Sequence, residues 1–152
     1  NRDVWNRAGL IDNINKLIDF FHEKDLPVVF ARHTNASFSK KDTPDWQICD
    51  CIHTKAGDAI INKTKSSIFS EKEFNNYLEQ NQISGIIVTG LVSNGCVQAA
   101  CLDGLKHGLK VILAEDGHST FHKGQAAMVE QWNKTLAEHG VLVIPTDSLL
   151  SK

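Results

Sequence analysis

The sequence predicts an α/β fold of the doubly wound class, in which a mainly parallel sheet forms the middle layer of a three-layer α/β/α sandwich. Two observations support this prediction. Short, nearly all-apolar runs alternate with helical patterns along the chain, as in parallel sheets that helices cover on both faces. The chain has 152 residues and contains no internal repeat or linker, which indicates one domain over residues 1–152.

Helices and strands are expected in a regular order. Apolar residues at helical spacing, from Ile11 to Phe21, predict a helix over about residues 9–24. The apolar, β-branched segment 27–31 predicts a buried strand. The remaining expected elements are a long loop at 33–57, a short strand at 58–63, a helix from a Ser70-x-x-Glu73 capping box to about 80, strands at 86–88 and 111–113, a helix at 96–107 between them, a helix at 125–139 and a strand at 141–144.

Charge and cysteine content exclude several classes of protein. Lys and Arg number 16 against 18 Asp and Glu, and the charges are interspersed, so neither nucleic acid nor a membrane surface is an expected partner. No apolar run approaches the roughly 20 residues that span a bilayer. Four cysteines in a chain of this length do not form the dense disulfide framework of a small secreted domain, which favours a cytoplasmic location.

Cys96 is the first candidate for chemistry. Ligands of doubly wound sheets bind at the carboxyl ends of the strands, where helices begin. Cys96 follows the predicted strand 86–88 and opens the next helix, and a helix N-terminus stabilises a thiolate. The alternative is a small buried residue, since free cysteines are among the most buried types, and we assign Cys101 to that alternative.

These residues also carry a resemblance to a known family. The segment 88–100 (VTGLVSNGCVQAA), with 108–111 and 115–116, resembles the isochorismatase-like cysteine hydrolase superfamily, which includes nicotinamidases, N-carbamoyl amidohydrolases and isochorismatases. Residues 61–69 (INKTKSSIF) are similar to the family's segment with the active-site lysine, and residues 27–33 resemble its second strand. The resemblance covers nearly the whole chain and implies a single Rossmann-like, isochorismatase-like hydrolase domain.

The resemblance implies a catalytic Cys96 and Lys63, whereas Lys65 is interpreted as a solvated or substrate-rim cation. Isochorismate-cleaving relatives typically lack the cysteine, so its presence favours cleavage of a C–N bond, amide or carbamoyl, through a covalent acyl-enzyme. No cofactor is implied. The resemblance further implies a cis peptide at Leu91-Val92 that turns the N–H groups of Val92 and Cys96 inward as an oxyanion hole.

The family's catalytic aspartate lies at the end of its first strand, and no residue of this sequence takes that place. Asp3 and Asp12 lie at or in the predicted first helix, so neither is assigned the role. We therefore expect the native polypeptide to extend upstream of Asn1 by about one strand of 5–6 residues and a turn, placed between the strands that start near Val28 and Ile86 and carrying the aspartate. The alternative function is a catalytically inactive or truncated family member that acts as a binding or oligomerising module.

Three residues in or beside the predicted loops are candidates for substrate binding. His33, Phe69 and Trp46 could line a slot for a small-molecule substrate. For the two aromatic residues the alternative is hydrophobic packing or a subunit contact, and for His33 it is a hydrogen-bonded structural role. The resemblance also implies a homodimer or a larger homo-oligomer.

No metal is predicted. The segment Cys49-x-Cys51-x-His53, joined by His118 or His122, could supply soft ligands, but structural zinc sites usually pair Cys-x-x-Cys with a second such pair. The metal motif of related nicotinamidases, Asp-x-His, is also absent after the second strand. Asp116 follows the strand 111–113 and is expected to be structural, accepting backbone hydrogen bonds.

Overall fold

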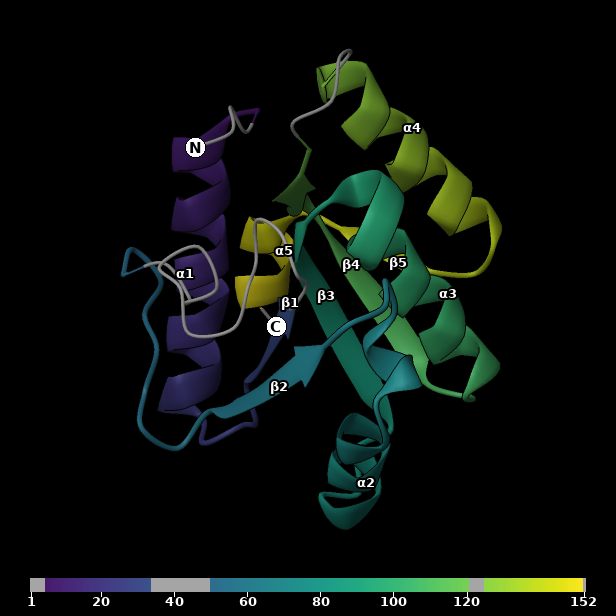
Figure 1. Ribbon diagram of the computed structural model, residues 1–152. Coiled ribbons are helices and arrows are strands. Elements are labelled where there is room, and N and C mark those ends of the chain that lie inside the picture. The colour runs from purple at the N-terminus through teal and green to yellow at the C-terminus, as the bar shows by residue number, and fades with distance from the viewer. Residues whose placement is uncertain (1–4, 34–49, 121–124, 152) are drawn as a thin grey trace.

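The computed structural model describes residues 5–33, 50–120 and 125–151 of the chain. In chain order its elements are α1 (Arg7–Glu23), β1 (Val29–His33), β2 (Ala59–Lys63), the 3₁₀ turn η1 (Ile68–Ser70), α2 (Lys72–Gln80), β3 (Gly85–Leu91), the π-helical turn η2 (Ser93–Val97), α3 (Gln98–Lys106), β4 (Lys110–Ser119), α4 (Gln125–Glu138), β5 (Leu142–Ile144) and α5 (Thr146–Leu150). From β2 onward its strands and helices alternate, whereas β1 and β2 follow each other without a helix in the described residues (Figure 1).

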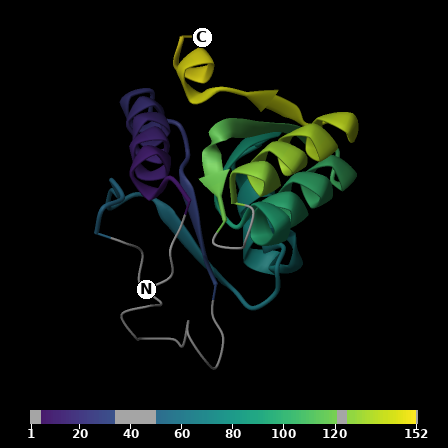
Figure 2. The ribbon, with the colours of Figure 1, turned by 90° about the horizontal axis from the view of Figure 1, so that it is seen from above.

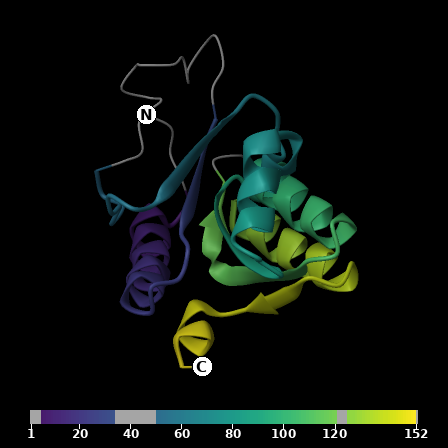
Figure 3. The ribbon, with the colours of Figure 1, turned by 90° about the horizontal axis from the view of Figure 1, so that it is seen from below.

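Every strand pair in the described residues is parallel, and helices cover both faces of the larger sheet. The order β3-β4-β5 forms this sheet, and β1-β2 forms a second one. Helices α1 and α5 lie on one side of β4, whereas α3 and α4 lie on the other (Figures 2 and 3). This arrangement confirms the predicted three-layer α/β class.

The alternation of side chains along β4 explains why this strand is apolar on both faces. Val111 and Leu113 point into a core with α3 and α4. Ile112 and Ala114, one residue out of step, pack with Leu17 of α1 on the opposite face. A central parallel strand with two covered faces requires this near-continuous apolar run.

The smaller sheet has less cover. Ile61 of β2 packs with η1 and α2 in a separate cluster, but its neighbour Ile60 is 42% exposed. Strands β1 and β3, between which the sequence analysis places a further strand, belong to different sheets and do not pair in the described residues.

The polar end of β4 was missed by the sequence analysis. The strand continues to Ser119 because it stays paired with β3 past an irregularity: Val88 pairs with Leu113, and Gly90 pairs with His118. Five residue steps in β4 therefore face two in β3, which is a large bulge. Apolar periodicity cannot detect a strand end made of polar residues.

The predicted capping box at Ser70 is wrong. Helix α2 begins at Lys72 after Glu71, without a side-chain cap. Ser70 belongs instead to η1, which Ser67 caps by accepting from the N–H of Phe69 at 3.1 Å. The Ser70 hydroxyl donates back to the Ser67 carbonyl at 2.7 Å, so an earlier local turn uses the side chain that the motif requires.

The short helix α5 was also not predicted. Asp116 Oδ1 accepts from the backbone N–H of Thr146 at 2.9 Å and from its hydroxyl, at the first residue of that helix. This contact confirms the structural role expected for Asp116. Within the described parts of the chain, no helix has the length and apolar character needed to cross a membrane.

Candidate active site

Lys63 and Cys96 meet at the junction of the two sheets. Lys63 is the last residue of β2, and Cys96 lies in the turn η2 after β3. The Nζ atom of Lys63 is 2.9 Å from Cys96 Sγ, and the lysine is only 3% exposed. The predicted approach of Lys63 to Cys96 is confirmed, and so is the register, because Lys65 is exposed.

Backbone carbonyl groups aim the lysine at the sulfur. The Lys63 ammonium donates to the carbonyl oxygens of Lys65 at 3.2 Å and Ser66 at 3.1 Å. An ammonium group has three protons and no acceptor, and Lys63 donates to Cys96 Sγ as well as to these two carbonyl oxygens. A buried positive charge at this distance stabilises negative charge on the sulfur and on a substrate oxygen beside it.

The turn that carries Cys96 has a backbone fixed by Val92. The peptide Leu91-Val92 is cis, as the resemblance implied. The carbonyl of Val92 accepts from the N–H groups of Gly95 at 3.0 Å and Val97 at 3.1 Å. At Gly95 a Cβ would lie 2.8 Å from Val92 Cγ2, so a side chain there would collide with the residue that closes the turn.

Three polar side chains lie behind this turn, and of these the sequence analysis considered only His118, as a possible metal ligand. Ser93, the first residue of η2, is 0% exposed, and His118 on β4 is 2% exposed. Ser93 Oγ lies 2.7 Å from His118 Nδ1, and His118 Nε2 lies 2.7 Å from Oδ1 of Asn133 on α4. Burial lowers the pKa of His118 from its usual 6.5, whereas the Asn133 hydrogen bond and the Asp116 charge act in the opposite direction. The position of His118 after an apolar strand was the one available sequence signal.

The cysteines differ in their surroundings. Cys96 is partly exposed and free. Cys101, one turn further along, is buried in the core, and that burial raises the pKa of its thiol to about 12. This confirms the packing role assigned to Cys101.

The segment considered as a metal site has other contacts. Cys51 is disulfide-bonded, and His53 Nδ1 lies 3.0 Å from Asp19 Oδ1. His118 is engaged by Ser93 and Asn133, as described above. Within residues 5–33, 50–120 and 125–151, no group of three or more His, Cys, Asp or Glu side chains is placed to hold a metal ion.

Of the three candidate substrate-binding residues, the structure describes the side chain of Phe69 alone. Phe69 is buried in the cluster around Ile61, and its ring lies 5.1 Å from that of Phe74, which is the packing alternative. His33 pairs in register with Lys63 through its backbone, but its side chain is outside the described residues, as is all of Trp46.

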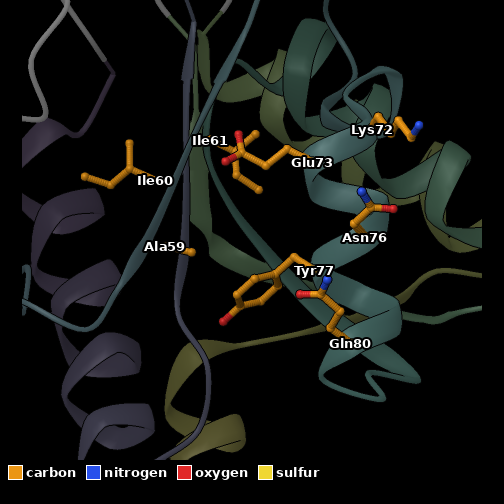
Figure 4. A pocket seen from close by; sticks show the side chains of 8 residues that line it. All are labelled: Ala59, Ile60, Ile61, Lys72, Glu73, Asn76, Tyr77 and Gln80. Atoms are coloured by element: carbon orange, nitrogen blue, oxygen red, sulfur yellow. The ribbon is translucent and has the colours of Figure 1, made fainter.

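Two hollows in the described structure lie away from the Lys63–Cys96 pair, since neither residue lines them. The larger, of about 550 Å³, lies between β2 and α2, where Glu73 and Tyr77 reach from the helix toward the strand (Figure 4). The smaller, of about 190 Å³, is lined by residues that include Trp5, His118, Ser119 and Asn133.

Comparisons with known proteins give similarities in sequence and in fold. A family model described as an isochorismatase domain matches residues 1–147. The chain is 26% identical to N-carbamoylsarcosine amidase from Arthrobacter sp, over 82% of this chain and 53% of that protein. It is 29% identical to ureidoacrylate amidohydrolase RutB from Pseudomonas syringae pv. syringae (strain B728a), over 76% of this chain and 60% of that protein.

A similar solved structure is the cysteine hydrolase from Pseudomonas syringae pv. phaseolicola 1448A. Its TM-score is 0.88 at 20% sequence identity, covering 97% of this chain and 81% of that chain. At this identity the similarity concerns the fold. The chain spans 53% to 64% of the length of the first curated relatives that it matches.

Proposed function

The chain belongs to the isochorismatase family, and from this premise we propose that it is a cysteine hydrolase that cleaves a C–N bond, amide or carbamoyl, of a small molecule. The observation that carries the proposal is the 2.9 Å contact between Lys63 Nζ and Cys96 Sγ. A thiol at the start of a helix, beside a buried ammonium group, is the arrangement that a nucleophile needs. Two of the relatives described above are named as an amidase and an amidohydrolase that act on such bonds.

In the proposed reaction the Cys96 thiolate attacks the carbonyl carbon, and the carbonyl oxygen becomes negatively charged. The N–H groups of Val92 and Cys96 serve as the oxyanion hole, with the Lys63 charge nearby. The C–N bond then breaks, the amine leaves with a proton, and a thioester remains on Cys96. Water hydrolyses this thioester, which releases the acid and restores the thiol.

This scheme uses a thiol, an ammonium group and backbone N–H groups of the chain and takes no cofactor. The resemblance assigns the proton delivered to the leaving amine to an aspartate, which we assign to no residue of this sequence. A small-molecule substrate is the proposed partner, while self-association and a cytoplasmic location stay predictions.

The experiment is a panel of small primary amides and N-carbamoyl compounds, with ammonia release as the signal. We expect at least one compound to be hydrolysed by the unaltered protein, and Cys96→Ala to abolish that activity. The matched control is Cys101→Ala, which removes the cysteine of the following helix α3 and leaves the Lys63–Cys96 pair unchanged. An acyl adduct on Cys96 in the intact mass would support the covalent step, whereas activity that survives Cys96→Ala would contradict the proposal.

One alternative is a catalytically silent family member that binds small molecules or partners. This alternative predicts that amides of the same panel bind without turnover. Calorimetry would measure binding and the ammonia assay would measure turnover. Binding without ammonia release would favour that alternative, provided that Cys96 of the same protein is still readily alkylated.

A further inference from the structure

A chain of buried hydrogen bonds supports the turn that carries Cys96. It starts at Ser93, three residues before the cysteine, whose hydroxyl lies 2.7 Å from His118 Nδ1 and 3.2 Å from the Ser119 carbonyl oxygen. It ends at Asn133, whose Oδ1 faces His118 Nε2 at 2.7 Å and whose Nδ2 donates to the Glu115 carbonyl at 3.2 Å. The turn is thereby tied to β4 and to α4.

The contacts of Asn133 determine where the protons lie. Since its Nδ2 donates to Glu115, its Oδ1 faces His118 and can only accept. Nε2 of His118 therefore carries a proton. Burial of the imidazole disfavours a second proton, so Nδ1 accepts, and the Ser93 hydroxyl donates to it rather than to the longer contact at Ser119. Ser93 has one proton, and this arrangement commits it to the histidine.

We infer that Ser93 and His118 are positioning residues, which hold the first residue of η2 so that Cys96 Sγ faces Lys63 Nζ. This inference rests on the proposed function, because it assigns a task to the support of its nucleophile. Neither side chain is proposed to touch the substrate; both act through the backbone of the turn. A buried polar network is costly unless its members are all paired, so apolar side chains of similar size would fill the same volume at lower cost.

The first test compares Ser93→Ala with Ser93→Thr, since only the threonine keeps a hydroxyl. The readout is the rate at which iodoacetamide alkylates Cys96, mapped by mass spectrometry on folded protein. We expect Ser93→Ala to lower this rate about tenfold to a hundredfold, the scale of a misplaced reacting group, and Ser93→Thr to restore most of it. With a substrate from the amide panel, kcat should fall with little change in KM.

The second test uses two amide side chains that each imitate one nitrogen of His118. Asparagine places its amide where Nδ1 lies, toward Ser93, whereas glutamine reaches the place of Nε2, toward Asn133. His118→Asn should therefore retain more Cys96 alkylation than His118→Gln, even where both variants lose similar stability. Equal losses of alkylation, or the reverse order, would contradict the inference.

The outcomes separate the inference from the proposed function. Alkylation at the unaltered rate in folded Ser93→Ala would overturn the positioning role and leave the hydrolase proposal intact. Amide hydrolysis that survives Cys96→Ala would overturn the cysteine hydrolase proposal, and the positioning role of Ser93 and His118 would fall with it. If the variants do not fold, nitrogen NMR of the unaltered protein decides: the Nε2–H tautomer of His118 is expected, and the Nδ1–H tautomer would overturn the proton assignment on which the inference depends.

Discussion

The two sheets differ in how well they are buried. Leu113, at the centre of the β3-β4-β5 sheet, is 0% exposed, whereas Ile60 in the β1-β2 sheet is 42% exposed. Helices cover the first sheet on both faces, but the second joins the rest mainly through Ile61 and its cluster with η1 and α2. Cys96 is held by the well-covered sheet, and Lys63 by the poorly covered one.

This difference shows that the candidate site depends on both halves. The position of the sulfur follows from a dense core and a buried polar network. The position of the ammonium group follows from a two-stranded sheet and two backbone carbonyl groups. Because local opening is easiest where burial is low, we expect the lysine side of the pair to be the first part of the site to loosen.

The largest expected effect is the difference in alkylation between Cys96 and Cys101, which lie in neighbouring turns. At pH 8 a thiol with a pKa of about 12, as burial gives Cys101, is ionised in only about one molecule in 10,000. A limiting amount of iodoacetamide should therefore label Cys96 and leave Cys101 unmodified, as read by peptide mass mapping under reducing conditions. Labelling of Cys101 before Cys96 would show that the core around α3 opens more readily than the site.

A stability comparison tests the two sheets directly. Leu113→Ala should lower the free energy of unfolding by about 2–5 kcal/mol, because it leaves a cavity in a closed core. Ile60→Ala should lower it by less than about 1 kcal/mol, because that side chain is largely exposed already. Urea denaturation measures both values. Similar losses in the two variants would mean that the β1-β2 sheet is buried more fully than the described residues show.

Removing the contact between the two halves should affect chemistry more than folding. Lys63→Met keeps the length of the side chain but deletes the charge beside Cys96, and we expect hydrolysis to fall about 100-fold to 1,000-fold, as for the loss of an oxyanion-stabilising group. The control is Lys110→Met, on the exposed start of β4. Hydrolysis at the same rate in both variants would exclude a catalytic role for Lys63.

The smallest expected effect is a pH dependence of stability from His118. Its pKa in the folded protein is lowered by burial from 6.5, so the unfolded chain binds the proton more readily. The free energy of unfolding should therefore be highest above about pH 6.5 and decline as the pH falls, by at most about 1.4 kcal/mol per pH unit. Denaturation curves of the unaltered protein and of His118→Asn test this, since the difference between their slopes isolates His118 from the other histidines.

Apolar periodicity predicted α1, and short apolar runs predicted the centres of the strands, because burial of one face or of both leaves a pattern in neighbouring residues. Helix α2 was instead predicted from a capping box that the structure does not form. The resemblance, together with the rule that ligands bind at strand ends, predicted the meeting of Lys63 and Cys96. The network behind the turn could not be predicted in the same way. Ser93 and His118 are 25 residues apart, and their pairing depends on the bulge between β3 and β4. At Ser70 the opposite occurred. The local capping-box motif was present, but the Ser70 hydroxyl donates to the Ser67 carbonyl of the preceding turn instead.

Because of the bulge, the number of residues at the end of β4 matters as much as their identity. Within four residues this strand end turns from one layer to the other: the Glu115 carbonyl accepts from α4, the Asp116 carbonyl accepts from Asn13 of α1 at 2.9 Å, and His118 returns to α4 and the cysteine turn. Since each of these groups is placed by its position along the strand, deleting one residue here would shift all three relative to their partners. The segment therefore acts as a spacer, in which substitutions change single contacts but a change in length would detach the outer helices and the cysteine turn from their partners together.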